Sequence, residues 1–177
     1  FKKDKLKVLA ELTKLRQICC DPRLHYEDYK AGSAKLDTCM ELVHGALDGG
    51  HRILLFSQFT GMLDIIGKRL AKEDIAFLKL TGASSKESRA KMVAQFQAGE
   101  VPVFLISLKA GGGLNLTAAD VVIHYDPWWN VAAQDQATDR AHRIGQQHTV
   151  TVYKLIAKDT IEERIMQMQE SKRDLVN

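Results

Sequence analysis

The stretch 126–147 contains the residues whose types and spacing most clearly suggest chemistry. On a helix, Gln136, Arg140 and Arg143 fall at positions i, i+4 and i+7 and therefore share one edge. A guanidinium group stays charged and offers a planar fork that matches the oxygens of a phosphate. This edge predicts a site for a polyanion. The simpler alternative is a surface helix in which Asp139 pairs with Arg143 at i, i+4.

A run of three glycines, Gly111 to Gly113, follows an apolar run and is the second group with chemical potential. Bare glycines let backbone N–H groups approach phosphate oxygens, and Lys109 adds a positive charge. The run matches neither GxGxxG nor GxxxxGK[ST], and the sequence contains no Walker A motif. The loop is therefore expected to touch a nucleic-acid backbone or the rim of a nucleotide that is held elsewhere.

The elements that must position these groups alternate along the chain between short apolar strands and amphipathic helices. Wholly apolar runs are typical of parallel strands, and short links between strands and helices favour a parallel sheet with helices on both faces. Strands are expected at 53–56, 76–80, 101–106, 120–124 and 149–156. Helices are expected at 4–19, 34–48, 61–73 and 86–98, between Asn130 as N-cap and Gly145 as stop, and after Asp159 or Thr160 with Glu162 or Glu163 completing a capping box.

Small polar residues follow four of the predicted strands. Ligands of such folds bind at the carboxyl ends of parallel strands, so these residues are expected to form one surface. The alternative is that any turn from a strand to a helix needs small polar residues. The residues are Ser57, Gln58, Thr81, Gly82, Ser107, Lys109, Gly111 and Asp126.

The composition is that of an ordinary globular protein, since 45% of the 177 residues are hydrophobic and 27% are charged. A net charge of +3 permits a nucleic-acid partner without requiring one. No apolar run approaches the ~18 residues of a membrane span and no secretory signal is visible, so no membrane partner is expected. Cys19, Cys20 and Cys39 lack metal-ligand spacing and are expected to be reduced, buried thiols, and no metal site is expected.

The sequence resembles the second RecA-like lobe of the SWI/SNF family of helicase-like ATPases, within helicase superfamily two. The resemblance covers nearly the whole chain, and its wording is closer to bacterial members than to eukaryotic remodellers. The motifs that carry it are ILLFSQF at 53–59, LTG at 80–82, LISLKAGG at 105–112 with LNL at 114–116, QATDRAHRIGQ at 136–146, and LRQICCDP at 15–22. It implies a RecA-like fold, of the P-loop NTPase type, that lacks its own Walker A motif.

The resemblance implies half of an ATP-driven motor. A first lobe, absent from this sequence, would hold the Walker A loop, Mg²⁺ and the catalytic acid. Arg140 and Arg143 would act as arginine fingers on the ATP, with Gln136 beside them. Gly113 and Asn115 would lie near the sugar and phosphates of the nucleotide. Asp139, close to the nucleotide, is expected to orient an arginine.

The same resemblance implies a second partner, double-stranded DNA, which this lobe would grip by its backbone. Small hydroxyl, amide and glycine positions suit contacts to phosphate that do not read bases. Of the two tryptophans, Trp128 and Trp129, one is expected in the core and one, assigned to Trp129, at the DNA. The other residues assigned to DNA are Ser57, Gln58, Thr81, Gly82, Ser107, Lys109 and Gly111.

Three segments are expected. Residues 1–32 form a helical segment that leads in from the preceding lobe, 33–157 form the RecA-like lobe, and 158–177 form a brace-like helix. The alternative for the last helix is that it packs on its own sheet. The chain, which begins with Phe1, is expected to be a fragment of a longer protein. Its expected location is the cytoplasm, at the nucleoid in a bacterium or in the nucleus of a eukaryote.

One departure from the family concerns the glycine loop. Family members usually read KAGGxGLNL, with one residue more between Gly112 and Leu114 than this sequence has. A deletion here would move Gly113 and Asn115 relative to Lys109. Two other functions are compatible with parts of the sequence. One is a stand-alone DNA- or partner-binding regulatory module without catalysis. The other is a dinucleotide-dependent enzyme, against which the absence of GxGxxG argues.

Overall fold

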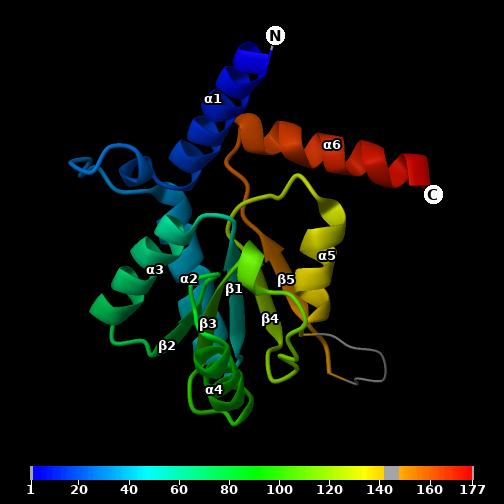
Figure 1. Ribbon diagram of the computed structural model, residues 1–177. Helices are drawn as coiled ribbons and strands as arrows, with labels where there is room; N and C mark the ends of the chain where they lie inside the picture. Colours follow the sequence, from blue (N-terminus) through cyan, green and yellow to red (C-terminus); the bar gives the residue numbers. More distant parts are fainter. Residues whose placement is uncertain (1, 142–147, 177) are drawn as a thin grey trace.

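The computed structural model describes residues 2–141 and 148–176 of the chain. It contains a five-stranded sheet flanked by helices (Figure 1). The strands are β1 (Ile53–Ser57), β2 (Phe77–Leu80), β3 (Val103–Ser107), β4 (Val121–His124) and β5 (Thr151–Lys154). The helices are α1 (Lys2–Cys20), α2 (Ala34–Asp48), α3 (Thr60–Lys72), α4 (Lys86–Gln97), α5 (Val131–Asp139) and α6 (Ile161–Val176), with short 3₁₀ helices η1 (Pro22–Leu24) and η2 (Leu108–Ala110).

Neighbouring strands of the sheet run parallel, in the order β2-β3-β1-β4-β5. β1, β3 and β4 are buried along their whole length, as their apolar runs predict. In the pairing register, Ser57 lies opposite Ser107, and Phe56 lies opposite His124. The ends of these central strands are therefore level, and the loops that follow them meet at one edge, which we call the carboxyl edge.

Helices cover both faces of the sheet, which confirms the predicted architecture. Successive side chains of a strand point to opposite faces, so Leu55 and Leu54 belong to different cores. On the side of Leu55, α2 and α3 complete the core with residues such as Ile66. On the side of Leu54, α4 and α5 complete it with Phe96 and Ala137. The faces are closed by helices, and the carboxyl edge remains for the loops.

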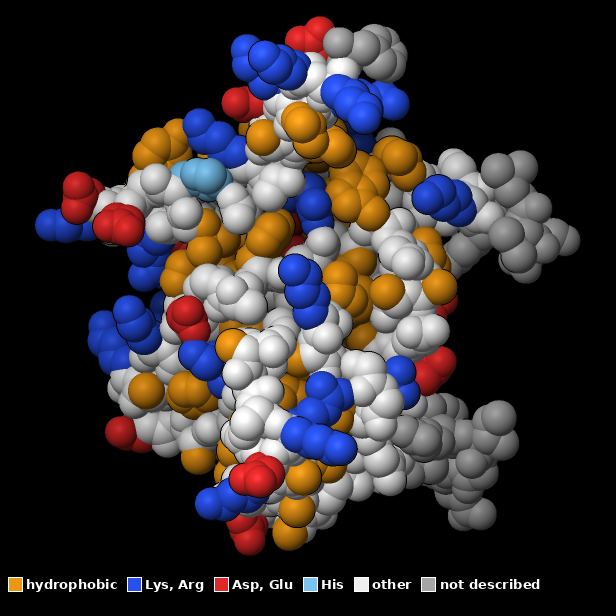
Figure 2. Space-filling view, viewed as in Figure 1, with side chains coloured by type: hydrophobic (Ala, Val, Ile, Leu, Met, Phe, Trp, Pro, Cys, Tyr) orange, Lys and Arg blue, Asp and Glu red, His pale blue; other side chains and the backbone are white. Residues whose placement is uncertain are grey.

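The first and last helices lie largely outside these two cores, and of the described residues of α1 only the last, Cys20, is part of one, on the Leu55 side. In Figure 1, α1 projects beyond the carboxyl edge and α6 runs across the same end of the molecule. The first helix exposes apolar side chains, since Val8 is 58% exposed and Leu15 49% exposed. Figure 2 shows apolar side chains of α1 exposed among its lysines. On α6, Ile165 is buried and Met168 is 48% exposed. None of the described residues of α6 belongs to either core.

The helix predicted between Asn130 and Gly145 is shorter than expected. Asn130 caps it as predicted, since its side-chain oxygen accepts a hydrogen bond from the Ala133 N–H at 3.3 Å. The helix ends at Asp139, however, and the carbonyl of Arg140 accepts a hydrogen bond from the Leu116 N–H at 3.0 Å. This long-range bond takes an acceptor that further helical turns would need. Gly145 lies outside the described residues.

Within the part of the chain that the structure describes, no helix is long and apolar enough to cross a membrane, and no group of three His, Cys, Asp or Glu residues could hold a metal ion. The three cysteines are free thiols. Cys20 and Cys39 are buried as predicted, whereas Cys19 is only partly buried. Burial raises the pKa of all three thiols, which keeps them protonated and weakly reactive at neutral pH.

Candidate functional site

A pocket of about 170 Å³ lies where the glycine loop meets α5. It brings together two groups that are separate in the sequence, the loop after β3 and the helix edge that carries Gln136 and Arg140. Arg140 is half-buried, whereas Gln136 and Lys109 are exposed. The lining consists of Phe56, Leu108, Lys109, Gly111, Gly112, Trp128, Ala133, Gln136, Ala137 and Arg140.

Two buried leucines fix the glycine loop against the end of α5. Leu114 and Leu116 are buried in the core on the α4 and α5 side, and the Leu116 N–H donates to the Arg140 carbonyl. Arg89 of α4 also donates to the carbonyl of Gly112. These anchors place a cation and glycine backbone in the lining of one pocket, an arrangement that suits an anionic ligand.

The other residues assigned to the nucleotide lie outside this lining. The chain turns into the core at Leu114 and again at Leu116, which leaves Asn115 between them exposed. Gly113 is exposed with φ +76°, a conformation that favours glycine. Asp139 is exposed at the end of α5. Arg143, and with it the proposed Asp139 pair, lies outside the described residues.

A buried polar layer supports α5 from below. His124 of β4 stacks on Phe56 and makes a 3.0 Å hydrogen bond with the Thr138 hydroxyl of α5. The side-chain carbonyl of Gln134 accepts from the backbone N–H of Trp128 at 3.3 Å, and the Gln169 side chain of α6 donates to the backbone carbonyl of Trp128. Trp128 is therefore the tryptophan in the core, 1% exposed. These buried contacts fix the position of α5, and thus of Arg140, relative to the sheet.

Ser57 and Ser107, both assigned to DNA, are buried at the ends of their strands. The Ser57 hydroxyl donates to Asp126 Oδ1 at 2.5 Å and accepts from the Phe59 N–H at 3.1 Å. The Gln58 N–H donates to the other oxygen of Asp126 at 3.2 Å. The side chain of Ser57 thus shapes the turn after β1 and is not presented to solvent; the sequence alone could not separate these two uses of a small hydroxyl.

The remaining residues of the predicted DNA surface reach the outside of the carboxyl edge. Gln58, Thr81 and Gly111 are partly exposed, and Gly82 and Lys109 are exposed. A Cβ added at Gly82 would lie 3.9 Å from the Lys109 Cβ, so the loops after β2 and β3 are in contact range. The structure therefore brings these loops together as predicted.

Sequence reasoning missed Arg16, whose guanidinium joins two loops of the carboxyl edge. It donates to the Gln58 side-chain carbonyl and lies over the rings of Phe59 and Trp129, 5.4 and 5.7 Å from their centroids. The Gln58 amide N–H₂ donates in turn to the Pro127 carbonyl at 2.8 Å. An arginine on a helix gives no signal of such contacts unless its long-range neighbours are known.

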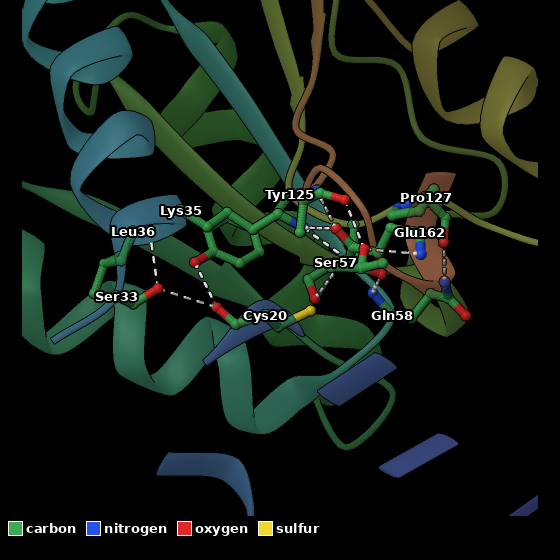
Figure 3. A network of polar contacts seen from close by, with 12 residues as sticks. Cys20, Ser33, Lys35, Leu36, Ser57, Gln58, Tyr125, Pro127 and Glu162 are labelled. Atoms are coloured by element: carbon green, nitrogen blue, oxygen red, sulfur yellow. Dashed lines mark hydrogen bonds and ion pairs between the residues drawn. The ribbon is translucent and has the colours of Figure 1, made fainter. Parts of the chain in front are cut away.

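A buried ion pair at the carboxyl edge was also missed. Figure 3 shows Lys35 of α2 reaching Glu162 of α6, with Nζ 2.6 and 2.8 Å from the two carboxylate oxygens. Glu162 also accepts from the Ala157 N–H at 2.8 Å, and the Tyr125 hydroxyl donates to the Cys20 carbonyl at 2.9 Å. Part of the predicted capping box forms, since the Thr160 hydroxyl accepts a hydrogen bond from the Glu162 N–H. The Glu162 carboxylate instead forms the ion pair with Lys35.

Two buried groups give opposite pH dependences. Desolvation raises the pKa of Asp126 from 3.8 to about 6 and lowers the pKa of His124 from 6.5 to about 3. The stability that Asp126 contributes is complete below about pH 3.8 and is lost as pH rises through 6. The stability that His124 contributes is complete above about pH 6.5 and is lost as pH falls through 3. Between pH 4 and 6 the two effects oppose each other.

Asp126→Asn should therefore make the protein more sensitive to acid. Without the opposing carboxyl, lowering the pH from 6 to 4 should reduce the free energy of unfolding by roughly 2 kcal/mol more than in the wild type. A single titrating group changes this free energy by about 1.4 kcal/mol per pH unit at most. Urea denaturation at a series of pH values measures this. Asp64→Asn, on the exposed surface of α3, is the control. Parallel curves for wild type and Asp126→Asn would contradict the assigned pKa.

Comparison with known proteins places this geometry in a family. Residues 34–145 match the model of the helicase conserved C-terminal domain. An uncharacterised ATP-dependent helicase of Mycoplasma pneumoniae is 44% identical over 99% of this chain, which covers 17% of that protein. The chain thus spans less than a fifth of this relative.

Solved structures agree with the sequence comparison. The SWI2/SNF2 ATPase core of Sulfolobus solfataricus in complex with double-stranded DNA superposes with a TM-score of 0.84 at 42% identity, over 98% of this chain and 37% of that one. The separate C-terminal domain of that ATPase gives a TM-score of 0.81 at 37% identity, over 97% and 71%. The chain therefore belongs to the helicase conserved C-terminal domain family, as the RecA-like C-terminal lobe of a SWI2/SNF2-type ATPase.

Proposed function

We propose that this chain is the second motor lobe of a duplex-DNA-stimulated ATPase that moves along DNA. The observation that carries the proposal is the pocket in which Arg140 and Gln136 face the glycine loop, on a sequence without a Walker A motif. A lobe of this kind cannot cradle the triphosphate itself, and it offers a cation to phosphates that are held opposite. A first lobe of the same parent chain would supply the Walker A loop.

In this proposal ATP and Mg²⁺ are held mainly by the first lobe, and Arg140 reaches the transferred phosphoryl group. The chemistry of the pocket fits: guanidinium and glycine backbone favour phosphate oxygens, and no described cluster of acidic residues competes for Mg²⁺. Charge that develops on the phosphoryl oxygens in the transition state would be stabilised by this preorganised cation. Arg143 is proposed as a second finger and Gln136 as its neighbour.

Three residues would act beside these. Gly113 and Asn115 are exposed on the stretch that continues the glycine loop, and we propose that they meet the nucleotide when the two lobes close. Asp139, one residue before Arg140, would orient an arginine. The one-residue difference from the family pattern falls in this loop and would move Gly113 and Asn115 relative to Lys109.

The carboxyl edge would grip the backbone of duplex DNA. Its exposed polar groups come from the loops after β1, β2 and β3, and Lys109 adds a positive charge. Hydroxyls, amides and glycine backbone contact phosphate without reading sequence. Ser57 and Ser107, which are buried, would shape these loops from inside. Closing and opening of the two lobes during ATP turnover would then move this grip along the duplex.

The isolated 177-residue chain should show negligible ATP hydrolysis, because it lacks the loop that cradles the triphosphate. A coupled phosphate-release assay with Mg²⁺, with and without duplex DNA, measures this. The same assay on the full-length protein that contains both lobes is the positive control. Robust Mg²⁺-dependent turnover by the pure 177-residue chain would contradict the half-motor proposal.

Binding of duplex DNA to the isolated chain should be weak, independent of sequence and steeply dependent on salt. Phosphate contacts release counterions, so the logarithm of the affinity should fall linearly with the logarithm of salt concentration. Fluorescence anisotropy with two unrelated duplexes of equal length, across a salt series, tests this. A preference for one sequence that persists at high salt would argue against backbone recognition.

A further inference from the structure

Arg16 joins α1 to both the loop after β1 and the loop after β4. Its guanidinium donates to the side-chain carbonyl of Gln58 and lies over the Trp129 ring at 5.7 Å from the centroid. Phe59 presents a second ring at 5.4 Å. A cation held between two aromatic rings and an amide acceptor restricts the orientation of all three partners.

The contacts of Gln58 show how far this restriction extends. The side-chain carbonyl accepts from Arg16, the side-chain N–H₂ donates to the Pro127 carbonyl, and the backbone N–H donates to Asp126. Both ends of the amide are therefore held. Pro127 directly precedes the two tryptophans, so the loop that carries Trp129 is tied to Gln58 from one side and to Arg16 from the other.

These contacts need the guanidinium group and not only a positive charge. Arginine can donate a hydrogen bond in the plane of its fork while it stacks its face on an aromatic ring. The ammonium group of lysine is a compact, strongly hydrated charge that cannot do both. Burial lowers the pKa of Arg16, chiefly by desolvation, and Asp126 opposes this effect; arginine nevertheless stays charged in proteins.

We propose that Arg16 is a positioning residue for the DNA grip: it holds Gln58 and Trp129 in the orientation in which the carboxyl edge meets duplex DNA. This inference rests on the proposed function of that edge. Arg16 belongs to α1, of whose described residues only the last, Cys20, joins a core of the lobe.

The test compares Arg16→Ala and Arg16→Lys with wild type in the 177-residue chain. Lys7→Ala, which removes an exposed cation from the same helix, is the matched control. The first measurement is acrylamide quenching of tryptophan fluorescence. Trp128 is buried, so a change in quenching reports on Trp129, which is partly exposed. Both Arg16 variants should be quenched more strongly than wild type, and Lys7→Ala should not.

The second measurement is the affinity for duplex DNA across a salt series. Both Arg16 variants should bind about five- to tenfold more weakly than wild type, as loss of about one cation–π contact predicts, with an unchanged salt slope. A residue that contacts a phosphate directly would instead lower the slope by about one unit when it is removed. Lys7→Ala should change the affinity little.

Several outcomes would overturn the positioning role. A salt slope that falls by about one unit in Arg16→Ala would make Arg16 a direct phosphate ligand. Rescue of both readouts by Arg16→Lys would show that charge alone suffices. Increased quenching with unchanged affinity would separate Trp129 from the grip. If wild type itself fails to bind duplex DNA, the proposed function of the edge fails, and the fluorescence measurement still shows whether Arg16 holds Trp129.

Discussion

Replacing Arg140 with alanine should lower DNA-stimulated ATP hydrolysis by the full-length protein about a thousandfold or more, the range expected for an arginine finger. Arg140 is half-buried at the end of α5 and lines the same pocket as the glycine loop. Its backbone carbonyl is fixed by the Leu116 N–H, so the side chain starts from an anchored position. Removing it leaves developing charge on the phosphoryl oxygens without this preorganised cation.

The kinetic pattern distinguishes this role from a loss of folding. The rate at saturating ATP and DNA should fall, whereas binding of ATP to the first lobe should change much less, because the finger acts mainly in the transition state. Arg69→Ala on α3, which breaks pairs with Glu73 and Asp37 on the surface, is the matched control and should keep nearly full activity. Near-normal turnover by Arg140→Ala would contradict the assigned role.

Removing one partner of the buried ion pair should be the most destabilising single change at the carboxyl edge. The side chains of Lys35 and Glu162 are only 8% and 1% exposed, and Nζ lies 2.6 Å from the carboxylate. Glu162→Ala would leave the Lys35 ammonium buried without its carboxylate and the Ala157 N–H without its acceptor. A buried charge left uncompensated in this way costs roughly 3–5 kcal/mol.

Urea denaturation of the 177-residue chain measures that cost. The control is Asp64→Ala, which breaks the exposed pair with Lys79 and should change the free energy of unfolding by less than about 1 kcal/mol. The double variant Lys35→Met with Glu162→Gln removes both charges and should recover much of the stability lost in Glu162→Ala. Equal costs for the buried and the exposed pair, or no recovery in the double variant, would contradict this reading of the network.

The sheet could be predicted from the sequence because its signal is local. Runs such as 53–56 and 120–124 are apolar throughout, and turn residues separate them from helices with their own period. Parallel pairing then puts the residues after each strand at one edge, so the meeting of Lys109 with Gly82 followed from topology alone. The shared position of Gln136 and Arg140 at the pocket followed from helical spacing, because Gln136 lies in α5 and Arg140 directly follows its last residue.

The remaining features depend on contacts between distant parts of the chain. Lys35 and Glu162 are 127 residues apart, and no local pattern pairs them. Helical periodicity groups Val8 with other apolar residues on one stripe, but it does not show that α1 leaves the body of the lobe and exposes Val8. The early end of α5 results from a hydrogen bond to Leu116, more than twenty residues earlier. Long-range bonds of this kind overrule local preference, and only the structure reveals them.

The central claim, that this lobe is half of a DNA-stimulated motor, is tested most directly by the ATP hydrolysis rate of the full-length protein with and without duplex DNA, measured beside the 177-residue chain. The account predicts that duplex DNA raises the rate of the full-length protein several-fold or more and that the 177-residue chain remains inactive in both conditions. A rate that duplex DNA leaves unchanged, or turnover by the 177-residue chain alone, would contradict it.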